Sequence, residues 1–161
     1  MDIVSHALIG SLIASKTHNP KVVFWSTIFS VLPDIPQIPQ YFFVGFLGRR
    51  KFWIPKSQDW KGVTAKYPGW AAQYFIPHSF FILPIIGLVI WLFKLPLLAL
   101  VAYALHIIID IFTHTGEWSV KPFYPFKYKV SGLTNAWLWL PQYWVLSWII
   151  LSAAMVIFKI F

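Results

Sequence analysis

The chain contains no cysteine and little charge, and each absence excludes classes of protein. Without cysteine there is no disulfide, no thiolate nucleophile and no cysteine-ligated zinc, while the redox compartment stays open. Charged residues make up 11% of the 161 residues, whereas a soluble domain has about a quarter. Only five residues are acidic, so the formal net charge is +8. In so apolar a chain this excess favours contact with anionic lipid, and we expect no nucleic-acid partner.

Apolar residues dominate the rest of the composition. Hydrophobic residues reach 58% and aromatic residues 20%, with ten tryptophans, which is typical of a membrane protein whose aromatic rings lie at the lipid–water interface. Five apolar segments follow one another, at 3–14, 22–32, 79–93, 95–113 and 143–161. The sequence therefore predicts one all-α domain over 1–161, a polytopic integral membrane bundle of about five transmembrane or membrane-embedded helices.

The individual segments differ in length. The first two are shorter than the roughly 20 residues that cross a bilayer, so they are tilted spans or a hairpin buried among the other helices. Pro84 predicts a kink in the third segment. The third and fourth segments are separated only by the short stretch around Lys94 and Pro96, so they are predicted to form a tight antiparallel pair.

Basic residues are distributed unequally between the two ends of the predicted bundle. If each segment reverses direction, the connections 33–77 and 116–142 lie at the same end as the N-terminus. That end carries Arg49, Arg50, Lys51, Lys56, Lys61, Lys66, Lys121, Lys127 and Lys129, against Lys16, Lys21, Lys94 and Lys159 at the other. The bias predicts that the first end is cytoplasmic. The aromatic stretch 122–126 is expected to be a structural plug against the membrane surface.

The fourth segment carries the most informative pattern. His106, Asp110 and His114 follow one another at four-residue steps inside an apolar run, so they fall within roughly 80° of one helix face. An ionisable side chain in a membrane helix is costly and marks a functional site. Histidine and aspartate at this step also hold a metal ion from one side. A histidine–aspartate pair that stabilises the core without metal is the alternative.

The same alternation of direction brings further ionisable residues to this end. They are Asp2 and His6 at the start of the first segment, Asp34 after the second, His78 before the third, and Glu117 beyond the fourth. Imidazole and carboxylate ligands without thiolate suit Zn²⁺, with Mn²⁺ and Fe²⁺ as alternatives. There are more candidates than one ion needs, so either two ions bind or some residues orient the ligands. Asp2 can equally cap a helix, Asp34 can initiate a turn, and Ser79 can be a cap or a substrate contact.

Four short blocks resemble the YdjM-like family of membrane-bound, metal-dependent hydrolases. They are Asp2-Ile3-Val4-Ser5-His6-Ala7-Leu8-Ile9-Gly10, Leu32-Pro33-Asp34-Ile35-Pro36, Pro77-His78-Ser79, and His106 to Gly116 followed by Pro122-Phe123 and Pro125-Phe126. Pro36 stands where the family's second block has another acid, and the family's Arg-Gly-x-Thr lead-in to His78 is missing. The resemblance implies an inner-membrane hydrolase with the metal ligands His6, Asp34, His78, His106 and Asp110.

Two hypotheses about function follow. In the first, the chain is a metal-dependent hydrolase that acts at the membrane interface on a lipid or lipid-linked ester, with a phosphoester as the preferred class. Asp34, His78, Glu117 and His114 are then the candidates for acid–base chemistry. In the second, it is a transporter, channel or membrane-organising component with a proton or cation site. The apolar far half of the helices favours the first, and the sequence leaves the substrate and oligomeric state open.

Overall fold

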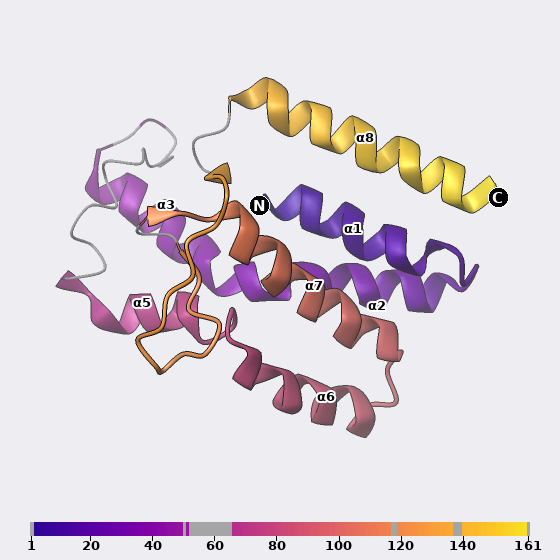
Figure 1. The fold of residues 1–161 in the computed structure, drawn as a ribbon, viewed down its shortest axis with the longest axis horizontal. Helices are drawn as coiled ribbons and strands as arrows, with labels where there is room; N and C mark the ends of the chain where they lie inside the picture. The colour runs from indigo at the N-terminus through magenta and orange to yellow at the C-terminus, as the bar shows by residue number, and fades with distance from the viewer. Residues whose placement is uncertain (1, 50, 52–65, 117–118, 137–139, 161) are drawn as a thin grey trace.

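A computed structural model describes residues 2–49, 51, 66–116, 119–136 and 140–160 (Figure 1). Within these ranges the regular elements are helices, so the all-α prediction is confirmed. The α-helices are α1 (Ile3–Ser15), α2 (Pro20–Val31), α3 (Ile38–Leu47), α5 (Pro68–Phe75), α6 (Leu83–Leu92), α7 (Leu97–Thr113) and α8 (Pro141–Ile160). Two 3₁₀ helices, η1 (Leu32–Gln37) and η4 (Phe80–Ile82), lie before α3 and α6.

Five helices form a bundle, and one of its ends collects the polar residues. α1 and α2 form an antiparallel hairpin, α7 packs against both, α6 pairs with α7, and α8 lies along α1 (Figure 1). At one end of the bundle α1 begins, α2 and α7 end, and α3 and α5 gather (Figure 1). This arrangement agrees with the alternation of direction predicted from the sequence, and it brings His6, Asp34 and Asp110 to the same end.

The α1–α2 hairpin depends on small side chains. A Cβ at Gly10 would lie 2.6 Å from the carbonyl oxygen of Ser26 and would also collide with Oγ of Ser30. Across the same contact, Ser11 and Thr27 share a hydrogen bond of 2.7 Å between their hydroxyls. The two helix backbones therefore approach more closely than larger side chains would allow.

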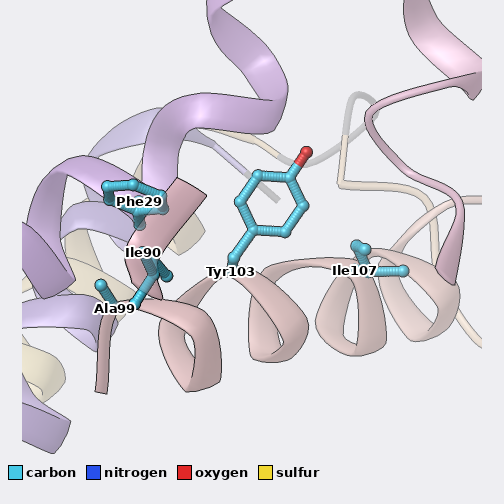
Figure 2. Close-up of a cluster of buried hydrophobic side chains, with 5 residues drawn as sticks. All are labelled: Phe29, Ile90, Ala99, Tyr103 and Ile107. Atoms are coloured by element: carbon cyan, nitrogen blue, oxygen red, sulfur yellow. The ribbon is translucent and has the colours of Figure 1, made fainter. Parts of the chain in front are cut away.

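An apolar cluster joins α2, α6 and α7. Figure 2 shows its buried members, Phe29, Ile90, Ala99, Tyr103 and Ile107. The hydroxyl of Tyr103 points away from α7 and donates a hydrogen bond of 2.9 Å to the carbonyl of Pro77. This bond ties α7 to the residue that precedes His78, so the cluster also holds one corner of the polar end.

The predicted kink at Pro84 is wrong. The segment 79–93 is divided into η4 and α6, and Pro84 lies in the first turn of α6. A first-turn proline leaves the helix straight, because its missing N–H has no acceptor within the helix there. Ser79 is the cap of η4, and its Oγ accepts a hydrogen bond from the N–H of Phe81.

Residues 119–136, called the strap here, run back across the polar end of the bundle. The N–H of Gly132 donates to the carbonyl of His114 at 2.8 Å, and the N–H of Phe80 donates to that of Pro122 at 2.7 Å. A Cβ at Gly132 would lie 2.6 Å from the carbonyl oxygens of Ile111 and Phe112. The absence of a side chain at Gly132 therefore lets the strap lie against the end of α7.

Among the described helices, α8 is the one long and apolar enough to cross a membrane. Its window Pro141–Phe158 has a mean hydropathy of 1.6 and is not buried inside the structure. The apolar helices Ile3–Ser15, Phe80–Leu92 and Leu97–Thr113 are shorter. The described part of the chain is thus all-helical, with one helix long and apolar enough to cross a membrane.

Candidate metal centre

Four side chains form a compact group at the polar end of the bundle. Asp34 of η1, His78 of the turn before η4, and His106 and Asp110 of α7 each offer one ligand atom, and these atoms lie within 4.8 Å of one another. The side chains of both histidines and of Asp110 are at most 1% exposed, whereas Asp34 is 15% exposed. The group can therefore hold a metal ion, and Asp34 forms its more open side.

Five of the six distances between the ligand atoms are close to those of a tetrahedral site. Nε2 of His78 lies 3.1 Å from Nε2 of His106, 3.4 Å from Oδ2 of Asp110 and 3.5 Å from Oδ1 of Asp34. Nε2 of His106 lies 3.4 Å and 3.7 Å from the same two oxygens. Ligands about 2.0–2.2 Å from a tetrahedral ion are about 3.3–3.6 Å apart. These five distances, from 3.1 to 3.7 Å, lie close to that range, so the group can hold such an ion.

Main-chain carbonyls orient both imidazoles. Nδ1 of His78 lies 2.8 Å from the carbonyl oxygen of Tyr74, and Nδ1 of His106 lies 2.6 Å from that of Ser30. Because a carbonyl can only accept, each Nδ1–H donates, and each Nε2 faces the other ligand atoms. Metal-binding histidines commonly donate their second N–H in this way, which holds the ring in the ligating orientation.

Helix ends supply these two carbonyls. Tyr74 and Ser30 are each the penultimate residue of their helices, α5 and α2. The last four carbonyls of an α-helix have no partner within the helix, so they accept from side chains. Neither residue was predicted from the sequence. Both act through the main-chain carbonyl, which every residue type has, so the residue type does not reveal this role.

The second carboxylate oxygen of Asp110, Oδ1, contacts His6. Nε2 of His6 lies 3.0 Å from Oδ1 and, since a carboxylate only accepts, donates to it. The ring of His6 also stacks on His106, with 3.7 Å between centroids. His6 thus lies outside the four-ligand group and orients two of its members, and its predicted role as a ligand stays a prediction.

The remaining predicted residues have separate positions. His114 is buried, with Nδ1 at 3.1 Å from the carbonyl oxygen of Asp110 and 3.5 Å from its Oδ1. Asp2 caps α1, accepting from the N–H of Ser5 at 3.0 Å and from Nε1 of Trp148 at 2.9 Å, so the capping alternative is confirmed. Glu117, Arg50, Lys56 and Lys61 lie outside the described residues.

Replacing His6 by phenylalanine is expected to weaken metal binding about 10- to 100-fold, because the ring stack remains while the hydrogen bond to Asp110 is lost. The measurement is the metal dissociation constant by chelator competition on the purified protein. His18→Asn is the control, because His18 lies in the exposed turn between α1 and α2. Equal affinity in wild type and His6→Phe would contradict the orienting role.

The carboxylates of Asp110 and Asp34 change the pKa of His78. Burial alone lowers the pKa of its imidazole, but the hydrogen bonds and charges of Asp110 and Asp34 outweigh burial and raise the pKa to about 9. For Asp34, burial opposes ionisation, and the hydrogen bond from His78 together with the nearby imidazoles lowers its pKa. Without metal, His78 is therefore protonated at neutral pH and Asp34 is ionised.

Metal affinity is expected to rise with pH. A metal ion must displace the proton of His78, so below pH 9 binding releases one proton from this residue and the affinity rises up to about tenfold per pH unit. Chelator competition between about pH 6.5 and 8.5 measures the slope. Calorimetry in two buffers of different ionisation enthalpy measures the released proton, and a flat affinity over this range would contradict the assignment.

Comparison of the chain with protein-family models, with curated proteins and with solved structures gives no match. The centre therefore rests on the geometry of its own residues. The resemblance to the YdjM-like family, made on the four sequence blocks, stays a prediction. Position 36, where that family has its second acid, is an exposed proline here and does not belong to the four-residue group.

Proposed function

We propose that this chain is a polytopic, membrane-bound, metal-dependent hydrolase that acts on a lipid or lipid-linked phosphoester at the cytoplasmic face of the inner membrane. The observation that carries the proposal is the group formed by Asp34, His78, His106 and Asp110. Its four ligand atoms lie within 4.8 Å of one another, and both of its imidazoles are oriented for ligation. The resemblance to the YdjM-like hydrolases, with their metal-dependent chemistry, points the same way.

Exposed apolar side chains support a membrane location. α8 has 20 residues, so it is about 30 Å long and can cross the hydrocarbon layer. The shorter helices also expose large apolar side chains, among them Phe24, Ile85, Leu88, Trp91, Leu97 and Val101. Soluble monomers rarely expose a continuous apolar surface of this extent. Lipid contact accounts for it, and we assign α1, α2, α6 and α7 as embedded helices beside α8.

The ligand types favour zinc. Two imidazoles and two carboxylates in tetrahedral spacing suit Zn²⁺, and Mn²⁺ or Fe²⁺ are the alternatives. When bound, such an ion lowers the pKa of a water molecule to about 7 and polarises a phosphoryl oxygen. Asp34, the most exposed member of the group, lies where substrate approaches. As an ionised carboxylate it either completes the ligand set or accepts a proton, and His114 and Glu117 are further acid–base candidates.

The basic residues favour an anionic substrate. In the sequence, the connections 33–77 and 116–142 carry nine lysines and arginines and two acids besides Asp34, and positive charge at the membrane surface attracts anionic headgroups. Among those described, Lys121 lies near the centre, with Nζ 4.2 Å from the ring centre of Phe75, which follows Tyr74 in α5. A phosphoester headgroup combines the negative charge with an oxygen that a metal ion can bind.

The proposal is tested first by metal content and then by hydrolysis. Elemental mass spectrometry on detergent-purified wild type should find about one zinc per chain, and His106→Ala should contain none. Lipid phosphoesters are then screened with both proteins, with zinc-dependent release of product expected from wild type alone. The rival hypothesis of a proton or cation path is tested in liposomes, where metal-independent proton flux with no hydrolysis would replace our proposal.

A further inference from the structure

An aromatic patch projects from the strap next to the start of α6. It consists of Phe81, Phe123, Phe126 and Tyr128. The ring centres of Phe81 and Phe126 are 6.0 Å apart, those of Phe81 and Phe123 are 6.1 Å apart, and those of Phe123 and Tyr128 are 6.4 Å apart. All four side chains are exposed, Phe126 and Tyr128 to 63%. The rings therefore form one continuous apolar surface.

This patch continues an apolar stripe along α6. Ile85, Leu88 and Leu92 follow Phe81 at steps of three or four residues, and each is more than half exposed. Residues at this spacing lie on one helix face. If the α6 stripe lies against lipid chains, the aromatic patch at its end lies at the depth of the headgroups, where aromatic rings are favoured.

Positive charge surrounds the patch. Lys127 and Lys129 are exposed beside Phe126 and Tyr128, and Lys121 lies on the ring of Phe75. The strap contains no acidic residue. Lysine side chains can bury their methylene groups among the rings and place their ammonium groups at lipid phosphates. The patch thus matches an anionic headgroup layer in both polarity and charge.

Hydrogen bonds connect the patch to the metal centre. Ser79 Oγ donates to the carbonyls of Pro122 and Tyr124 at 3.2 Å each, and the N–H of Phe80 donates to Pro122. Ser79 directly follows His78, a member of the four-ligand group. A lipid headgroup held at the patch is therefore held at a fixed position relative to the centre.

We infer that the aromatic patch, together with Lys121 and Lys127, is a docking site for the anionic phospholipids of the surrounding leaflet. The inference rests on the membrane location in the proposed function and deepens it, because the patch sets the depth and lipid environment at which the centre works. It requires no chemistry at the metal. The same surface then concentrates negatively charged lipids next to the segment that carries His78 and Ser79.

The test is lipid binding by the full-length protein in detergent. Dioleoylphosphatidylglycerol and dioleoylphosphatidylcholine are titrated separately, and bound lipids are counted by native mass spectrometry. Wild type is expected to bind the anionic lipid about tenfold more tightly, and Lys121→Gln/Lys127→Gln is expected to lose most of this preference. The matched control is Lys16→Gln/Lys21→Gln. Lys16 also lies over an aromatic ring, that of Phe158. Lys16 follows the last residue of α1 and Lys21 lies in the first turn of α2, so both control lysines lie at the end of the α1–α2 hairpin opposite His6.

Metal content, measured on the same samples, separates the two proposals. Loss of preference in the patch variant alone, with metal content unchanged, supports the docking site. Equal binding of the two lipids by wild type, or the same loss in patch and control variants, overturns it even if metal is present. A wild type that prefers the anionic lipid but holds no metal would overturn the hydrolase and leave the docking site standing.

Discussion

Asp110→Ala is expected to abolish metal binding, with zinc content falling from about one ion per chain to none. Asp110 supplies Oδ2 to the ligand group and Oδ1 to His6, and it is 1% exposed. Its loss leaves the imidazoles of His78 and His106, 3.1 Å apart, without the carboxylate that both face. Removing one partner from a buried charged pair also destabilises the fold by about 3–5 kcal/mol.

Asp110→Asn makes the comparison sharper because it keeps the volume of the side chain. The amide loses the negative charge, so we expect affinity to fall at least a hundredfold, measured by chelator competition. Asp2→Asn is the matched control, since an asparagine caps a helix about as well as an aspartate and Asp2 lies in the cap of α1. Full zinc content in Asp110→Asn would show that the ligand group is wrongly assigned.

Gly10→Ala is expected to destabilise the protein by about 1–3 kcal/mol, the usual cost of forcing extra atoms into a packed contact. The new Cβ would meet the carbonyl of Ser26, which belongs to the backbone of α2 and cannot rotate away. Thermal unfolding in detergent, followed by circular dichroism, measures the effect. Gly87→Ala is the control, because the Cβ there would meet only Leu100 Cδ2 at 3.6 Å, and alanine favours a helix more than glycine does.

Metal binding should weaken in Gly10→Ala as well. Oγ of Ser30 donates to the carbonyl of His6 at 2.8 Å, and the carbonyl of the same serine accepts from His106. A shift of α2 away from α1 therefore moves the carbonyl of Ser30, which orients His106. It also disturbs His6, which donates a hydrogen bond to Asp110. If Gly10→Ala lowered the unfolding temperature while zinc affinity stayed constant, the hairpin would stabilise the fold without positioning the centre.

Part of the centre could be predicted because it depends on local periodicity. His106 and Asp110 share a face of α7 because four residues nearly complete a helical turn, and this spacing is visible in the sequence. The alternation of apolar segments also correctly placed Asp34 and His78 at the same end of the bundle as α7. These predictions need only the helix repeat and the direction of each segment, both of which are local properties of the chain.

The division between ligands and orienting residues could not be predicted in this way. His6 carries the same residue type as His78, and both precede or begin an apolar segment. Only the packed structure shows that His6 faces Oδ1 of Asp110 while His78 faces Oδ2. That difference depends on how closely α1, α2 and α7 approach one another, which is a relation between segments far apart in the chain.

The sequence was sufficient to predict that the chain is all-helical, that it is unusually rich in apolar residues, and that one helix carries a histidine and an aspartate on the same face. Composition and periodicity suffice for these, because each residue contributes to them independently. Only the folded chain shows that Pro84 lies in the first turn of α6, that the carbonyls of Ser30 and Tyr74 orient the imidazoles, and that the strap crosses the polar end. These features arise from contacts between distant segments. A backbone carbonyl is the same group in every residue, so only its location in the fold gives it a particular partner.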